Sequence, residues 1–106
     1  MDHLGPGDKI FIENKVMPYF NIPAVAIQYS PSKAKWPDIW CDVSKRIITV
    51  TDEWRRQNAA ERRKRIVHEF LHLTGMQHHK VGRLDYNTKP ALDTYSKAVY
   101  ENIANG

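Results

Sequence analysis

Four of the five histidines lie within twelve residues, in the segment His68-Glu69-Phe70-Leu71-His72-Leu73-Thr74-Gly75-Met76-Gln77-His78-His79. Two helical residues four positions apart differ by about 40° around the axis, so the imidazoles of His68 and His72 project from one face, one turn apart. Imidazole pairs with this spacing chelate a tetrahedral metal ion. The segment therefore predicts a metal centre with His68 and His72 as ligands.

A third ligand is expected from His78. Gly75 tolerates positive φ, so the chain can leave the helix there and bring His78 back toward the metal within three residues. Asp85 and Glu101 are rival third ligands. Three histidines leave a fourth position for water, which is typical of a catalytic site. Imidazoles with one open position favour Zn²⁺, although nickel, cobalt and copper bind the same ligands.

Glu69 is the predicted catalytic residue. It lies about 100° around the helix from His68, beside the metal without being a ligand. There it can take a proton from a metal-bound water and pass it to a leaving amine, which is amide hydrolysis. No serine or cysteine nucleophile is required, and Cys41 is expected in a strand as a core residue.

The helix that carries these residues must be buried on its opposite side. Apolar side chains from Ala59 to Leu73 form one arc, and Glu61, Lys64 and Arg65 fall near the histidines, so that side is expected to open to water or a cleft. Either Thr51 or Asn58 can cap the start of helical structure, with Glu61 reaching back in a capping box. Gly75 is the expected stop after Thr74.

The remaining elements predict an α+β fold: a small domain with an N-terminal helix, a three-stranded sheet, the active-site helix and a C-terminal helix. Asp8 is expected to cap the first helix, which carries apolar residues from Ile10 to Met17, and Pro18 limits its length. Alternating residues predict strands over 23–29, 38–43 and 46–51, the last two joined as a hairpin across Ser44-Lys45. Helical spacing of Leu92, Tyr95, Val99 and Ile103 predicts a helix over 91–103.

The length of 106 residues suits one domain, 1–106. No apolar run approaches the ~20 residues that span a bilayer, so no membrane contact is expected. The N-terminal residues lack the basic and apolar regions of a secretory signal, and a single cysteine forms no intrachain disulfide. We therefore expect a cytoplasmic protein. The net charge of +4 raises the question of nucleic acid, but many small domains carry such a surplus.

The motif His68-Glu69-x-x-His72-x-x-Gly75-x-x-His78 resembles that of the zincin metallopeptidases, and its long form is the metzincin pattern. Metzincins have a methionine turn beneath the metal, whereas this chain has no methionine after Met76. Length and element order more closely resemble the minigluzincins and selecase-like minimal metallopeptidases. The resemblance implies a zinc endopeptidase with an extended polypeptide substrate bound along an edge strand, where Trp36 and Trp40 are expected to line subsites or the core. Tyr86 and Tyr95 are candidates to stabilise the oxyanion.

The same resemblance implies that the C-terminal segment can cover the cleft, within one molecule or by self-association, and keep the enzyme latent like a zymogen. The alternative role for the expected helix over 91–103 is to close the hydrophobic core, and the sequence favours neither role over the other. Two other functions stay open. Bacterial rRNA-maturation endoribonucleases are similar around His72 and His78, but they have glycine where this chain has Glu69, which a peptidase needs as a base. An inactive zincin module that only binds metal is the third interpretation.

Overall fold

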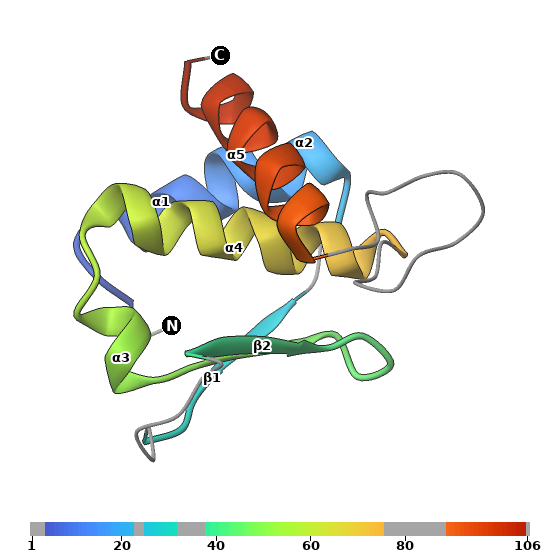
Figure 1. The fold of residues 1–106 in the computed structure, drawn as a ribbon. Coiled ribbons are helices and arrows are strands. Elements are labelled where there is room, and N and C mark those ends of the chain that lie inside the picture. Colours follow the sequence, from blue (N-terminus) through green and yellow to red (C-terminus); the bar gives the residue numbers. More distant parts are fainter. Residues whose placement is uncertain (1–3, 23–24, 32–37, 76–88, 106) are drawn as a thin grey trace.

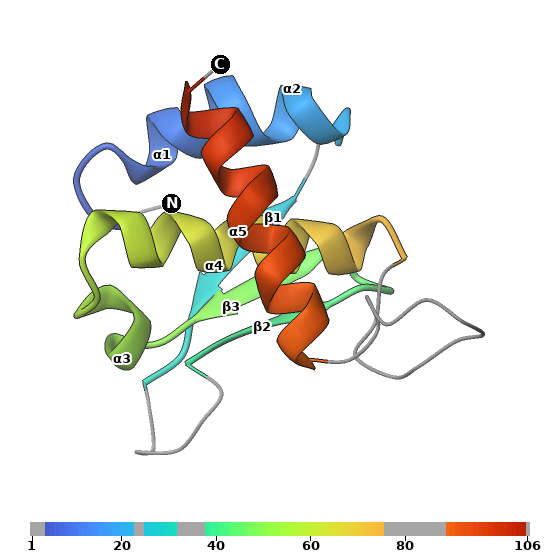
Figure 2. The same ribbon diagram turned by 45° about the horizontal axis from the view of Figure 1, so that its top comes forward.

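The computed structural model describes residues 4–22, 25–31, 38–75 and 89–105, with the backbone alone for 89–93. Its α+β architecture confirms the predicted fold class. Helix α4 (Ala59–Leu73) lies between the three-stranded sheet and a layer that contains the N-terminal helices and α5 (Lys89–Asn105) (Figure 1). Figure 2 shows α5 crossing over α4 on the side away from the sheet. Within the described ranges, no helix is long and apolar enough to cross a membrane.

The N-terminal helical segment differs from the prediction at both ends. Gly7, with φ of 77°, precedes the first helical residue, so Asp8 is inside the helix and caps nothing. The chain passes through α1 (Asp8–Phe11), a π-helical turn (Ile12–Val16) and α2 (Met17–Phe20), and it ends at Asn21 with φ of 55°.

Pro18 does not stop this segment, because a widened turn comes directly before it. The N–H of Met17 donates to the carbonyl of Ile12, five residues back. Such a turn gives the Pro18 ring space that a regular α-helix denies it. Ile10, expected in the core, is 65% exposed on α1.

The sheet contains β1 (Ala26–Tyr29), β2 (Ile39–Asp42) and β3 (Ile47–Val50) in the order β1-β3-β2. β2 and β3 pair antiparallel with Ile39 opposite Val50, which confirms the hairpin, and β1 runs parallel to β3. Ile48 and Val50 are buried as predicted. Thr49 is also buried, although it faces the other side, because Gln28 and Trp40 flank it and the Gln28 amide donates to its hydroxyl at 2.9 Å.

Two separate caps start two separate helices after the sheet. The Thr51 hydroxyl accepts from the Trp54 N–H at 3.4 Å and starts α3 (Asp52–Arg55). The Asn58 side-chain oxygen Oδ1 accepts from the Glu61 N–H at 2.9 Å and starts α4. The predicted capping box is wrong, because the Glu61 carboxylate pairs with Lys64 at 3.0 Å instead. Gly75 ends α4 with φ of 104°, as predicted.

The core lies between the sheet, α4 and the layer above it. Val99 and Ile103 of α5 belong to it, but Tyr95 is 39% exposed, and the Leu92 side chain lies outside the described residues. The other buried apolar residues of this cluster are Phe11, Ile12, Val16, Ile39, Ile48, Val50, Trp54, Ile66, Val67 and Phe70.

Candidate metal centre

Helix α4 is amphipathic, with its apolar side buried opposite the histidines, as the sequence predicts. Ile66, Val67, Phe70 and Leu71 are buried, and they fix the rotation of the helix about its axis. Ala60, which the apolar arc included, is exposed near the start of the helix. The burial of the opposite arc leaves His68 and His72 on a partly accessible side, where a ligand can reach both.

The structure brings His68, Glu69 and His72 together. The ring centroids of His68 and His72 are 4.9 Å apart, and the angle between the two ring planes is 68°. One nitrogen of each histidine and one Glu69 carboxylate oxygen all lie within 4.8 Å of one another. Glu69 Oε2 is 4.0 Å from His68 Nε2. The two side chains are 8% and 13% exposed respectively, so this carboxylate and imidazole are largely shielded from water. This group could hold a metal ion.

The side chains of this group are of kinds that bind divalent metal ions. A tetrahedral ion with nitrogen ligands at ~2.0–2.1 Å holds those ligand atoms roughly 3.4 Å apart. The ligand atoms of this group lie within 4.8 Å of one another, so a bound ion would require them to move closer together. Imidazole ligands also suit other transition metals, so the geometry allows a divalent metal without selecting one.

Several predicted site residues lie outside the described part of the chain. These are the third ligand His78, its rival Asp85, the oxyanion candidate Tyr86 and the subsite candidate Trp36. Glu101, the other rival ligand, is described and lies exposed on α5. Tyr95 lies half-exposed on the same helix. The structure therefore assembles His68, Glu69 and His72 and leaves the third ligand a prediction.

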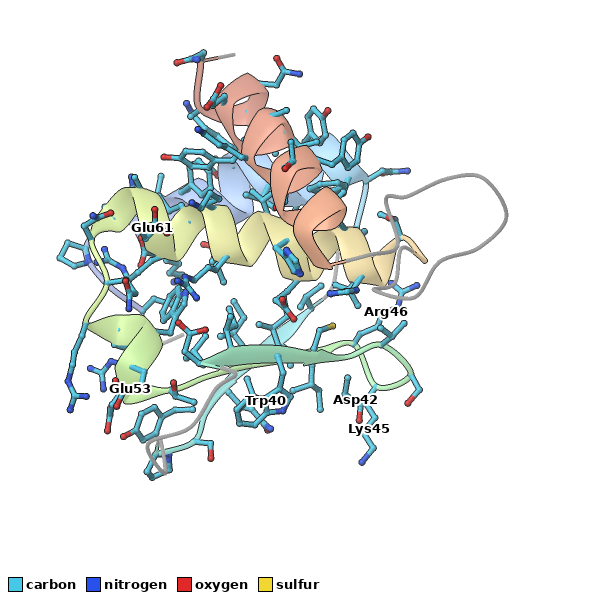
Figure 3. The ribbon with its side chains drawn as sticks, in the orientation of Figure 1. Trp40, Asp42, Lys45, Arg46, Glu53 and Glu61 are labelled. Carbon is cyan, nitrogen blue, oxygen red and sulfur yellow. The ribbon has the colours of Figure 1, made fainter. Side chains whose placement is uncertain are left out.

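The sheet supplies the floor beneath the centre. Cys41 of β2 packs partly buried against the core, as predicted. Burial, followed by the negative charges of Glu69 and Asp42, raises the pKa of the Cys41 thiol to about 12. A neutral thiol is a poor nucleophile, so Cys41 has no catalytic part here. Trp40 points away from α4 and is 39% exposed, so it lies neither in the core nor toward the histidines (Figure 3).

A cavity of about 330 Å³ adjoins the centre between α4 and α5. Glu61, Lys64, Arg65 and His68 form its α4 wall, at positions i, i+3, i+4 and i+7 of one helix face. This wall confirms the predicted polar side, and Figure 3 places Glu61 at its N-terminal end. The α5 wall consists of Thr94, Ser96 and Lys97.

Sequence reasoning missed the α5 wall and the partners of the basic run. Arg62 Nε and Arg63 Nε donate to the fully buried Asp8 carboxylate at 2.7 and 2.9 Å. Arg65 Nη1 donates to Asp38 at 2.8 Å. These partners are 27 to 55 residues away along the chain, so no local pattern could reveal them.

No family model matches the chain, and searches of curated proteins and of solved structures found no significant match.

Proposed function

We propose that this chain is a zinc-dependent endopeptidase. His68, His72 and His78 are the ligands in this proposal, and Glu69 is the general base. The observation that carries it is the grouping of the His68 and His72 imidazoles with the Glu69 carboxylate within 4.8 Å, beside a cavity that is large enough to admit a substrate group.

A bound zinc ion supplies Lewis acidity, which lowers the pKa of a water ligand toward ~7 and polarises a carbonyl oxygen. The chain supplies the proton transfer. The Glu69 carboxylate, 8% exposed, accepts a proton from the attacking water and then donates it to the leaving amine. The burial of Phe70 and Leu71 beside it fixes the helix, so the carboxylate needs little rearrangement before the reaction.

The basic run gives little support to the endoribonuclease alternative. Arg62 and Arg63 both bind the buried Asp8, Lys64 binds Glu61, and Arg65 binds Asp38, so carboxylates already offset most of the charge of this run. A peptide carries far less charge than RNA and requires no such surface. This pairing and the presence of Glu69 together favour a polypeptide substrate.

Metal content and casein hydrolysis test the proposal on the full chain. We expect about one zinc per chain and slow casein degradation. Glu69→Gln should keep the metal and the fold but lose roughly 10²- to 10⁴-fold in hydrolysis, because it removes the base. Glu53→Gln is the matched control, since Glu53 lies on α3, pairs with Arg56 and is remote from the centre (Figure 3).

Three outcomes would contradict the proposal in different ways. Full activity in zinc-loaded Glu69→Gln would exclude Glu69 as the base. Cleavage of structured RNA without any peptide cleavage would favour the endoribonuclease. Stoichiometric zinc with no hydrolysis of either substrate would favour an inactive metal-binding module.

A further inference from the structure

We propose that the cavity beside His68 is a substrate subsite that binds a carboxylate of the peptide, through Lys97 and Arg65. The inference deepens the proposed function, because it names a chemical preference of that same site. It depends on three properties of the cavity: its charge, the donors that remain available in it, and its distance from the histidines.

The cavity has a positive charge that its own ion pairs do not cancel. Lys64 pairs with Glu61 at 3.0 Å, and Arg65 pairs with Asp38 at 2.8 Å. Lys97 is exposed at the α5 wall, and no described side chain forms an ion pair or hydrogen bond with it. Among the described residues that line the cavity, the cations Lys64, Arg65 and Lys97 meet one carboxylate, Glu61, and Asp38 pairs with Arg65 from outside the lining. One positive charge of these described residues therefore has no counterpart.

Arg65 also has hydrogen-bond donors that its pair with Asp38 does not use. Its Nη1 makes both bonds to Asp38, at 3.0 and 2.8 Å, and its Nε is buried without a hydrogen-bond partner among the described residues. Asp38 therefore holds the guanidinium in place by one nitrogen. The other terminal nitrogen, Nη2, makes no hydrogen bond within the described part of the chain, and we infer that it is the Arg65 donor for an anion in this cavity.

One excess charge and these donors suit a carboxylate better than a more highly charged group. A carboxylate carries one negative charge and accepts two donors, one from Lys97 and one from Arg65. A run of phosphates would instead meet the Glu61 carboxylate in the same wall. The volume of about 330 Å³ is at the lower end of the ~300–1,000 Å³ typical of ligand pockets, which fits a side chain or a chain end.

The cavity is close enough to the histidines to bind a substrate residue near the cleaved peptide bond. Lys64 and Arg65 precede His68 by four and three residues, or roughly 4.5 to 6 Å along the helix. An extended peptide advances about 3.3 to 3.6 Å per residue. The carboxylate therefore belongs to a residue within about two positions of the bond, either as an acidic side chain or as the C-terminus of the peptide.

Binding of matched peptides to the full chain, measured by calorimetry without metal so that no turnover occurs, tests the inference. One pair differs by Glu against Gln, and a second pair differs by a free or amidated C-terminus. We expect the carboxylate form of at least one pair to bind about three- to tenfold more tightly, and the preferred pair identifies the source of the carboxylate. The preference should shrink as salt rises.

Variants identify the residues. Lys97→Ala should reduce binding of the carboxylate peptide to the level of its neutral partner, Lys97→Arg should preserve most of the preference, and Glu61→Gln should strengthen it by releasing Lys64. Lys9→Ala, on the exposed surface of α1, is the control and should change nothing.

Equal affinity within both pairs, or a preference that survives Lys97→Glu, would overturn the inference. Tighter binding of a short RNA than of the carboxylate peptide would also overturn it. These outcomes can be distinguished from a failure of the proposed peptidase function. Peptide hydrolysis without a carboxylate preference removes only the subsite, whereas carboxylate binding without hydrolysis removes only the peptidase.

Discussion

The candidate metal centre depends on two residues, His68 and His72, whose imidazoles lie one turn apart on α4. The identity of the third ligand determines how strongly this centre would hold a metal ion. Glu101 lies on α5 four residues after Lys97, which lines the cavity beside His68. Four residues advance a helix by about 6 Å, so Glu101 lies one turn beyond this lining residue, with an exposed side chain. His78 is therefore the better candidate, in agreement with the spacing of the motif.

We expect His72→Ala and His78→Ala each to reduce zinc content to well below one per chain, because two ligands chelate far more weakly than three. Glu101→Ala should retain the metal. Elemental analysis after dialysis, with competition against a chelator, measures this. Loss of zinc in Glu101→Ala alone would transfer the third-ligand role to α5.

The Cys41 thiol provides a second test at the same scale. Its pKa of about 12 in the fold compares with ~8.5 for an unfolded thiol. At pH 9 the folded chain therefore holds little thiolate, and we expect alkylation by iodoacetamide to be at least about tenfold slower than in urea. The raised pKa also lowers stability as pH rises from about 8.5 toward 12, where only the unfolded state loses its proton. Equal alkylation rates in both states would contradict this environment.

The elements that position the centre are fixed by a mixture of local and distant contacts. Local signals could be predicted: Thr51 and Asn58 cap helices, Gly75 ends α4, and Ile48 and Val50 alternate into the core. Each depends on residues within a few positions, so the sequence displays the whole signal.

Asn58→Ala tests one local signal. The Asn58 side chain accepts from the Glu61 N–H at 2.9 Å on an exposed helix start, and its loss leaves that donor to water. We expect the free energy of unfolding to fall by about 1 kcal/mol, while Asn58→Asp should retain it. Urea denaturation followed by circular dichroism gives the difference. An unchanged midpoint in Asn58→Ala would show that this cap contributes nothing.

Distant contacts could not be predicted, because their partners are far apart in sequence. Asp8 was expected to cap a helix, but its carboxylate binds Arg62, Arg63 and the N–H of Gly5. Lys97 and His68 line the same cavity only because α5 packs on α4. Charge and spacing alone do not reveal such pairings. The grouping of His68, Glu69 and His72 could be predicted because the motif is local, and the walls of the cavity could be predicted only on the α4 side.

The Asp8 contact joins the N-terminal helices to α4, and its removal should be costly. Arg62 is buried, so Asp8→Ala leaves a buried charge without its partner. Breaking a buried pair in this way costs about 3 to 5 kcal/mol. We expect a marked fall in the urea midpoint of Asp8→Ala, and a double variant that also carries Arg62→Met should recover part of it. No change in the midpoint would show that water replaces the carboxylate at this position.

At the scale of the whole molecule, α5 serves both the core and the cavity. Val99 and Ile103 are buried in the core, whereas Thr94, Ser96 and Lys97 line the cavity beside His68. The buried half favours the core-closing interpretation of this helix. Covering of the site by the C-terminal segment, in one molecule or in an associated pair, remains a prediction that concerns the start of the helix.

Trimming the chain at Asp93 separates the two interpretations. Val99 and Ile103 each contribute roughly 1.5 to 3 kcal/mol by burial, and a domain of this size is stable by only about 5 to 15 kcal/mol. We therefore expect the trimmed chain to lose cooperative unfolding in calorimetry, and the specific activity of the full chain on casein to be independent of protein concentration. A trimmed chain that stays folded and gains activity, or full-length activity that rises on dilution, would instead establish α5 as an inhibitory cover.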